Sequence, residues 1–284
     1  MKIGELQQLF HTELQELYSV TEIQSLFSFF AEEYLQYNSI QLKMNTEEMV
    51  EDSVIVNIKQ ALHELKSGKP YQQILGKAYF YGEVFFINEN VLIPRPETEE
   101  LIELILSKVP NDKEIKILDI GTGSGCIAVT IAKHLKNAVV YALDYSEKAL
   151  EIAKKNAVLH EVNLHLIHQN YLDTTLSGSF DVIISNPPYI GVEEEVDIDT
   201  GVKDFEPMMA LFAPENDVLA FYRKIADDSE QKLNDGGFIF LEINQKLGPE
   251  TLALYQNTLS EVHLLKDLSG NDRMIWGKKQ SENL

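Results

Sequence analysis

Residues 117–126 read Ile-Leu-Asp-Ile-Gly-Thr-Gly-Ser-Gly-Cys, and this stretch decides the fold class. A mostly apolar strand runs directly into a loop with glycine at every second position, and an apolar helical segment follows. Glycine is needed where the backbone turns sharply from strand to helix and where a ligand lies against the main chain. The first acidic residue after the next apolar strand is Asp144, whose carboxylate can accept both hydroxyls of a ribose. The pattern predicts a binding site for a nucleoside-containing cofactor.

The spacing of the glycines distinguishes two classes of cofactor. A dinucleotide-binding loop has the spacing Gly-x-Gly-x-x-Gly, which would place its third glycine where this chain has Cys126. Here the third glycine is Gly125, and the spacing Gly-x-Gly-x-Gly suits an adenosine with an amino-acid tail and no pyrophosphate, as in S-adenosyl-L-methionine. A strand–helix turn without any ligand is the alternative, and the presence of Asp144 argues against it.

Short apolar strands alternate with helical segments around this loop. Strands are predicted at 115–120, 139–143, 164–167, 182–184, 238–243 and 274–276. A helix is predicted from Ser146, its N-cap, to Ala157, with small apolar residues on one face. This alternation predicts an α/β fold with an open, mostly parallel sheet covered by helices.

The first seventy or so residues differ, because their apolar residues recur at helical spacing. Three stripes share this spacing: Leu6, Leu9, Phe10, Leu14 and Leu17; Ile23, Leu26, Phe27, Phe30 and Tyr34; and Ile55, Ile58, Leu62 and Leu65. Polar and acidic residues fill the opposite faces, so we predict a small helical bundle with these side chains in its core.

A hairpin is predicted between the bundle and the sheet. Residues 79–87 and 91–93 read as its strands, and Asn88-Glu89-Asn90 as its polar turn. Pro94-Arg95-Pro96 then stiffens the exit. We therefore divide the chain into a helical domain at 1–75, a hairpin linker at 76–96 and the α/β domain at 97–284.

Composition limits the class of protein. The 284 residues include 45 acidic and 24 basic side chains, a net charge of −21, which counts against a dedicated duplex-binding protein. The single Cys126 excludes an internal disulfide and suits a reducing compartment. No apolar run approaches the ~18 residues of a membrane span, and the N-terminus has no signal-peptide core. We expect a cytoplasmic protein without a membrane partner. The histidines show no metal-ligand spacing, so no metal site is expected.

Asn186-Pro187-Pro188-Tyr189 follows the fourth predicted strand of the sheet, where open α/β sheets bind ligands. The prolines lack N–H donors and leave carbonyl groups free to face a substrate. The Asn186 side-chain oxygen and the Pro187 carbonyl can each accept one N–H of an –NH₂ group, and Tyr189 offers a flat face to a planar group. These parts suit methyl transfer to a weakly nucleophilic amide or exocyclic amine, because they fix the nitrogen and favour the charge that develops on it. An Asn-Pro turn without chemical consequence is the alternative.

With these motifs in place, the sequence resembles the class I S-adenosylmethionine-dependent methyltransferases. Within them it is similar to the protein-(glutamine-N5) methyltransferases that modify peptide chain release factors. Besides the two motifs above, the resemblance rests on Leu92-Ile93-Pro94-Arg95-Pro96-Glu97-Thr98-Glu99 and on the segments 70–76, 80–82, 205–211, 236–242 and 267–273. It covers nearly the whole chain.

The resemblance implies a Rossmann-like sheet of seven strands, a helical N-terminal domain that helps dock the release factor, and methylation of the glutamine in the factor's Gly-Gly-Gln loop. By motif position, the residues implied to contact S-adenosyl-L-methionine are Gly121, Thr122, Gly123, Ser124, Gly125, Asp144 and Asn186. The residues implied to hold the acceptor glutamine are Asn186, Pro187, Pro188 and Tyr189, of which Asn186, Pro187 and Tyr189 are the expected catalytic residues.

One segment departs from the family pattern. Beside the adenine the family usually has an acidic residue followed by Trp, whereas this chain has Asn170 followed by Tyr171. Asn170 can still accept a hydrogen bond from the adenine amine and Tyr171 can still stack, so both are kept as expected cofactor contacts. Arg95 and Glu97 could either anchor the linker or touch the methionine tail of the cofactor, and the sequence does not distinguish the two roles.

Other functions share parts of this pattern of motifs. The same chemistry on a glutamine of a ribosomal protein would use the same Asn-Pro-Pro-Tyr corner, and adenine-N6 methylation of nucleic acid shares that motif. The acidic balance and the lack of a basic domain argue against the second. A cofactor-binding module without catalysis would not need the complete acceptor corner. We expect a monomer with class I release factors as protein partners and no direct contact with nucleic acid.

Overall fold

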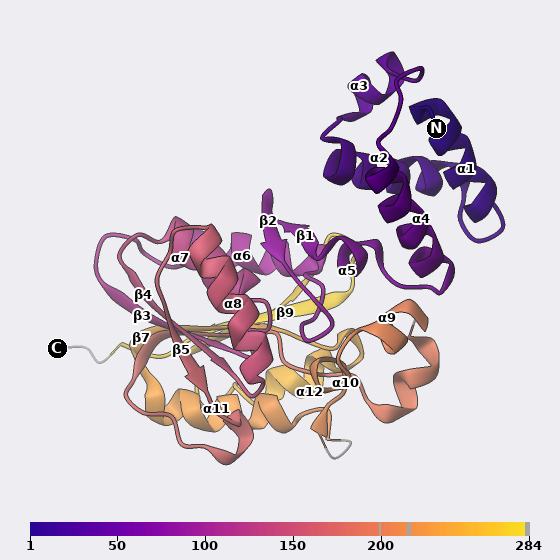
Figure 1. The fold of residues 1–284 in the computed structure, drawn as a ribbon. Helices are drawn as coiled ribbons and strands as arrows, with labels where there is room; N and C mark the ends of the chain where they lie inside the picture. The colour runs from indigo at the N-terminus through magenta and orange to yellow at the C-terminus, as the bar shows by residue number, and fades with distance from the viewer. Residues whose placement is uncertain (199, 215–216, 282–284) are drawn as a thin grey trace. The chain divides into compact units, whose positions relative to one another are not determined.

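A computed structural model gives the structure of the protein, and it describes residues 1–198, 200–214 and 217–281 (Figure 1). The chain forms two compact units, Met1–Gly76 with Asp199–Phe205, and Lys77–Ile198 with Glu206–Leu284. The hairpin residues thus belong to the larger unit and the short helix α9 (Thr200–Phe205) to the smaller one. The functional division at 1–75, 76–96 and 97–284 stays a prediction.

The smaller unit is helical. Its helices are α1 (Ile3–Leu14), α2 (Val20–Leu35), α3 (Ser39–Met44), α4 (Asp52–Lys66), α5 (Tyr71–Leu75) and α9. The three predicted apolar stripes fall on α1, α2 and α4, where their side chains form one core, with Phe10 edge-on to Phe27 at 5.5 Å between ring centroids. Leu17 is an exception, because α1 ends at Leu14 and Leu17 is 56% exposed. The side chain of Ser19 then caps α2, which requires a break in the helix before it.

The hairpin is present, but the prediction placed its turn wrongly. Strand β1 (Lys77–Phe80) pairs with β2 (Glu83–Phe86), so the turn lies at Tyr81-Gly82 and not at Asn88–Asn90. Both turn residues have a left-handed backbone, with φ of 52° and 74°, as the tightest hairpin turns require. Residues 91–93 form no strand. The glycine of a two-residue turn was therefore the stronger signal than the longer polar run.

The larger unit contains a seven-stranded sheet in the order β5-β4-β3-β6-β7-β9-β8. Its strands are β3 (Ile115–Ile120), β4 (Ala138–Asp144), β5 (Leu164–His168), β6 (Phe180–Ser185), β7 (Leu233–Glu242), β8 (Glu261–Lys266) and β9 (Asp272–Lys278). Only β9 among the described strands runs antiparallel to both of its neighbours, β7 and β8. The six predicted strands are confirmed, and β8 was missed. Its six residues include the charged Glu261 and Lys266 and the polar His263, so β8 lacks the apolar run of a central strand.

Helices cover both faces of the sheet (Figure 1). They are α6 (Pro96–Lys108), α7 (Cys126–His134), α8 (Glu147–Leu159), α10 (Met208–Leu211), α11 (Ala220–Lys232) and α12 (Gly248–Ala253), with short 3₁₀ turns η1 (Tyr171–Asp173), η2 (Val192–Asp197) and η4 (Gln245–Leu247). Ile117 packs with α6 and α7 in one core, whereas its neighbour Leu118 packs with α11 in the other. This alternation is the period-two pattern of a strand buried on both faces. None of the helices in the described residues is long and apolar enough to span a membrane.

The chain reverses its direction of travel across the sheet between β3 and β6. From β3 it proceeds outward through β4 to β5, then returns to place β6 on the other side of β3. The connections at the carboxyl ends of β3 and β6 therefore diverge, and the Ser185 hydroxyl donates to the Ile120 carbonyl at 2.8 Å between the two ends. Open α/β sheets bind ligands at such a point.

Gly125 illustrates how tightly the loop after β3 is packed. Its φ is +78°, and a Cβ placed there would lie 2.9 Å from the Ala153 Cβ on α8. We predict that Gly125→Ala lowers the free energy of unfolding by about 2–4 kcal/mol, because a left-handed alanine costs about 1 kcal/mol and the overlap costs more. Gly82→Ala is the matched control, since Gly82 also has a left-handed φ but open space at its Cβ position. Denaturant unfolding of both variants checks this, and equal losses would contradict the packing argument.

Candidate active site

A pocket lies at the carboxyl ends of β3, β4 and β6, within the larger unit. It brings together nine of the predicted site residues: Gly121, Thr122, Gly123, Ser124, Asp144, Asn170, Tyr171, Asn186 and Pro188. Gly125, Pro187 and Tyr189 lie outside its lining. The pocket is further bounded by residues 90–92, by Pro94 and Arg95, and by Pro207, Met209 and Ala210. Among these, only Arg95 was considered as a contact from the sequence, and its role was left open.

The glycine loop folds back on the next strand. The backbone N–H groups of Gly121 and Thr122 both donate to the Leu143 carbonyl, at 2.8 and 3.0 Å. Gly121 and Gly123 have φ of +74° and +55°, and no atom lies within 4 Å of the position where a Cβ would be. Both residues therefore present bare backbone to the pocket, which is the geometry that a ligand lying against the main chain requires.

Asp144 is the last residue of β4, as predicted, and its carboxylate borders the pocket. One oxygen accepts the Gly123 N–H and the other accepts the Ser146 N–H, each at 2.8 Å. Burial raises the pKa of Asp144, and these backbone donors oppose that shift. A carboxylate oxygen has two acceptor sites, so each can receive a further donor from a bound ligand. Asp144 thus links the glycine loop to the start of α8.

Beneath the loop lies a second carboxylate, Asp119, which the sequence analysis did not single out. It is fully buried, and its Oδ2 accepts the Thr122 hydroxyl at 2.6 Å. Its Oδ1 is one of two buried side-chain polar atoms without a hydrogen-bond partner in the described part of the chain. Burial raises the pKa of Asp119 to about 7, and the nearby Asp144 adds to the shift. The loop therefore rests on a carboxyl group that changes charge near neutral pH.

The loop is also held from the side by Asn156 on α8, which sequence reasoning missed. This fully buried amide donates to the Ser124 carbonyl at 2.8 Å and to the Phe86 carbonyl at 2.9 Å, and it accepts the Phe86 N–H at 2.7 Å. One side chain thereby joins the glycine loop, α8 and the hairpin strand β2. Only its position on the buried face of α8, beside small apolar residues, signalled it in the sequence.

Glu206 holds another wall of the pocket through hydrogen bonds to the segment before α6. Its buried carboxylate accepts the Ile93 N–H at 2.9 Å and the Arg95 guanidinium at 2.6 Å. Pro94 and Arg95 border the pocket, so Glu206 fixes this wall from a point more than a hundred residues away in sequence. Of the two roles left open for Arg95, the anchoring contact is present, although its side chain also reaches the pocket lining.

The Asn-Pro-Pro-Tyr corner follows β6 directly. Asn186 lines the pocket and donates through Nδ2 to the Thr98 hydroxyl at 3.3 Å. The Tyr189 hydroxyl donates to the buried Glu242 at 3.3 Å, and burial together with the Glu242 charge raises the pKa of Tyr189. The Asn244 side chain donates to the Tyr189 carbonyl at 3.1 Å, which fixes the end of the corner. Hydrogen bonds at its hydroxyl and at its carbonyl thus fix the position of Tyr189.

Asn170 and Tyr171 border the pocket from the carboxyl end of β5. The Asn170 side-chain oxygen caps η1 by accepting the Leu172 N–H at 3.3 Å. Tyr171 is 2% exposed, stacks on Phe221 and donates its hydroxyl to Asp228 at 2.8 Å. The stacking contact and the hydrogen bond together fix the orientation of the Tyr171 ring. Its role beside an adenine stays a prediction.

Within residues 1–198, 200–214 and 217–281, no group of three or more His, Cys, Asp or Glu side chains is arranged to hold a metal ion. Burial raises the pKa of the Cys126 thiol to about 12, so this side chain is protonated at neutral pH and is a poor nucleophile. The polar groups that line the pocket include the Asp144 carboxylate, the Asn170 and Asn186 amides, the Arg95 guanidinium and several hydroxyl groups.

Comparison with known proteins identifies the family. The Methyltransferase small domain family matches residues 97–202. The release factor glutamine methyltransferase of Flavobacterium psychrophilum is 45% identical over 267 residues, which cover 92% of this chain and 94% of that relative. The release factor glutamine methyltransferase of Lactococcus lactis is 43% identical over 230 residues, which cover 80% and 84%. The chain belongs to the family of release factor glutamine methyltransferases.

A solved structure agrees with the fold of the family. The 16S rRNA N2 G1207 methyltransferase of T. thermophilus, in complex with AdoMet and guanosine, is similar with a TM-score of 0.51 and 18% identity, over 72% of this chain and 50% of that one. At this identity the likeness bears on the fold alone. The predicted Rossmann-like seven-stranded sheet with helices before it is confirmed.

The raised pKa of Asp119 predicts a pH dependence of stability. Between about pH 4 and 7 the folded protein keeps the Asp119 proton that the unfolded chain releases, so the free energy of unfolding falls as pH rises, by up to about 1.4 kcal/mol per unit. We expect the difference in stability between the wild type and Asp119→Asn to decline from pH 5 to 7 and to level off above 7. Denaturant unfolding at several pH values measures it, with Asp112→Asn, at an exposed position, as the control. A difference independent of pH would contradict the assignment.

Proposed function

We propose that this chain transfers a methyl group from S-adenosyl-L-methionine to the side-chain amide nitrogen (N5) of the glutamine in the Gly-Gly-Gln motif of class I peptide chain release factors. The observation that carries the proposal is that Asn186 and the glycine loop line one pocket. The names of the relatives from F. psychrophilum and L. lactis support the choice of substrate.

The residues of the pocket fit the proposed cofactor. Open space beside Gly121 and Gly123 leaves room for a ligand against the backbone, and Asp144 can accept two ribose hydroxyls in addition to its backbone donors. We assign the binding of S-adenosyl-L-methionine to residues 121–125, Asp144, Asn170 and Tyr171. When bound, this cofactor supplies an electrophilic methyl group.

The Asn-Pro-Pro-Tyr corner would act on the acceptor. An amide nitrogen is a poor nucleophile, because its lone pair is delocalised toward the carbonyl carbon. Asn186 Oδ1 and the Pro187 carbonyl would each accept one of its N–H groups, which orients the nitrogen and favours the positive charge that develops on it. Pro188 and Tyr189 would bound the acceptor side chain. We also propose that the enzyme works as a monomer in the cytoplasm, where release factors act.

The direct test is mass spectrometry of a purified release factor after incubation with this protein and S-adenosyl-L-methionine. We expect one added methyl on the Gly-Gly-Gln glutamine and none on a release factor with glutamate in its place. Ribosomal proteins and duplex DNA are incubated in parallel. Methylation of either of these, with the release factor unmodified and cofactor binding intact, would overturn the proposal.

Two substitutions separate the acceptor corner from the cofactor site. Asn186→Ala should lower kcat by about 10²- to 10³-fold, because a preorganised acceptor for the developing charge is lost, and leave the cofactor Kd unchanged. Asp144→Ala should raise the cofactor Kd by about 10- to 100-fold through the loss of hydrogen bonds to a charged group. Steady-state kinetics and calorimetric titration measure the two effects.

Asn137→Ala is the control for these variants, since Asn137 is exposed and precedes β4 at its amino end, opposite the pocket. Wild-type turnover by Asn186→Ala would remove that residue from the mechanism, and an unchanged Kd in Asp144→Ala would remove Asp144 from the cofactor site.

A further inference from the structure

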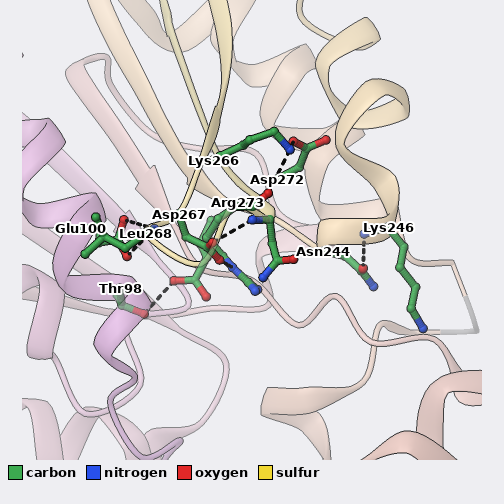
Figure 2. A network of polar contacts seen from close by, with 12 residues as sticks. Thr98, Glu100, Asn244, Lys246, Lys266, Asp267, Leu268, Asp272 and Arg273 are labelled. Atoms are coloured by element: carbon green, nitrogen blue, oxygen red, sulfur yellow. Dashed lines mark hydrogen bonds and ion pairs between the residues drawn. The ribbon is translucent and has the colours of Figure 1, made fainter.

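Behind the acceptor corner, one buried carboxylate holds two residues that border the reaction site. Glu242 is the last residue of β7 and is 2% exposed. Its Oε2 accepts the Thr98 hydroxyl at 2.7 Å, and its Oε1 accepts the Tyr189 hydroxyl at 3.3 Å. Thr98 lies near the start of α6, and Figure 2 shows it beside the cluster of polar side chains that includes Arg273 of β9.

The hydrogen bonds of Thr98 have only one consistent direction. An ionised carboxylate can accept but not donate, so the single Thr98 proton points to Glu242. The Thr98 oxygen is then left with lone pairs only, and it must accept from Asn186. The nitrogen end of the Asn186 amide therefore faces Thr98, at 3.3 Å, and the oxygen end is turned away from it.

Two hydroxyl groups and a guanidinium near Glu242 stabilise the charged form on which this direction depends, whereas burial disfavours it. Burial raises the pKa of Glu242, and Glu97 on α6 acts in the same sense. The Thr98 and Tyr189 hydroxyls and the Arg273 guanidinium oppose the shift. Arg273 is itself fixed by Asp267, whose Oδ2 accepts the Arg273 Nε–H at 3.1 Å (Figure 2). These contacts place a cation and two hydroxyl donors around a carboxylate that reaches no solvent.

We propose that Thr98 and Glu242 are positioning residues that set the orientation of the Asn186 amide, so that its oxygen rather than its nitrogen meets the acceptor –NH₂ group. The inference rests on the proposed function of Asn186. If the Thr98 hydroxyl reversed, it would donate to the Asn186 oxygen and turn the amide around. Two –NH₂ groups would then face each other, and neither could accept.

Thr98→Val tests this, because valine keeps the shape of threonine and removes its hydroxyl. We expect kcat to fall by roughly 10- to 100-fold, as for a misoriented catalytic group, with the cofactor Kd unchanged. Thr98→Ser keeps the hydroxyl and should restore kcat to near the wild-type value. Thr251→Val is the matched control: Thr251 is fully buried on α12, donates to the Leu247 carbonyl at 2.7 Å and lies outside the site. It should lose stability without losing kcat.

Glu242→Gln tests the carboxylate that accepts the Thr98 hydroxyl. This test does not depend on whether Thr98→Val folds well. Glutamine has the same shape but adds a donor, which permits the Thr98 hydroxyl to reverse. We expect a loss of kcat similar to that of Thr98→Val. The double variant should show no further loss, because each substitution alone already removes the constraint on the orientation of the Asn186 amide.

The outcomes separate this inference from the proposed function. Wild-type kcat in Thr98→Val and Glu242→Gln, with Asn186→Ala inactive, would overturn the inference and leave the proposed function standing. Wild-type kcat in Asn186→Ala as well would remove Asn186 from the mechanism and the inference with it, whereas a release factor left unmethylated by the wild type would overturn the proposed function. Losses that add in the double variant, or an equal loss in Thr251→Val, would also overturn the inference, because the effect would then be one of general packing.

Discussion

The parallel pairing of β3 with β6 is the constraint on which the rest of the site depends. The two strands are neighbours in the sheet although β4 and β5 intervene in the chain, so the loops that follow them diverge from adjacent points. One loop carries the glycines and the other carries Asn186. The Ser185 hydroxyl, bonded to the Ile120 carbonyl, fixes the separation of the two loops where they leave the sheet. The glycine loop and Asn186 are thereby held at one pocket.

Buried polar side chains, rather than the apolar core, shape the walls of the pocket. Asn156 holds the glycine loop to the hairpin, Glu206 holds the segment 93–95, and Glu242 holds Thr98 and Tyr189. Each of these side chains is at most 4% exposed and uses its polar atoms on segments far away in sequence. A buried polar group is costly unless it is bonded, so each one specifies a single position for the loop that it contacts.

Charge has two separate roles in this chain. At the surface, an excess of acidic residues gives the net charge of −21, which disfavours binding to a phosphate backbone at long range. In the interior, Asp119, Asp144 and Glu242 are carboxylates whose pKa burial raises, and each lies under or beside a loop of the pocket. The surface charge affects which molecules approach the protein. The buried carboxylates hold the loops of the pocket, and their protonation makes the stability of the fold depend on pH.

The sequence by itself determined the elements that depend on local pattern. The glycine loop, the position of Asp144 at the end of β4, the N-cap Ser146 and six of the seven sheet strands could all be predicted, since each follows from spacing, capping or an apolar run. The hairpin turn was misplaced because a two-residue turn at Tyr81-Gly82 competes with a longer polar stretch, and β8 was missed because polar residues interrupt its apolar run.

Only the tertiary structure decided which distant residues support the site. The contacts of Asn156, Glu206 and Glu242 could not be predicted from local pattern, because they depend on the backbone or side chain that each residue meets across the fold. A hydrogen bond between residues about a hundred positions apart depends on how strands and helices pack, and one sequence does not contain that geometry in readable form. The motif residues that line the pocket could thus be found from the sequence, whereas the side chains that hold their loops required the folded chain.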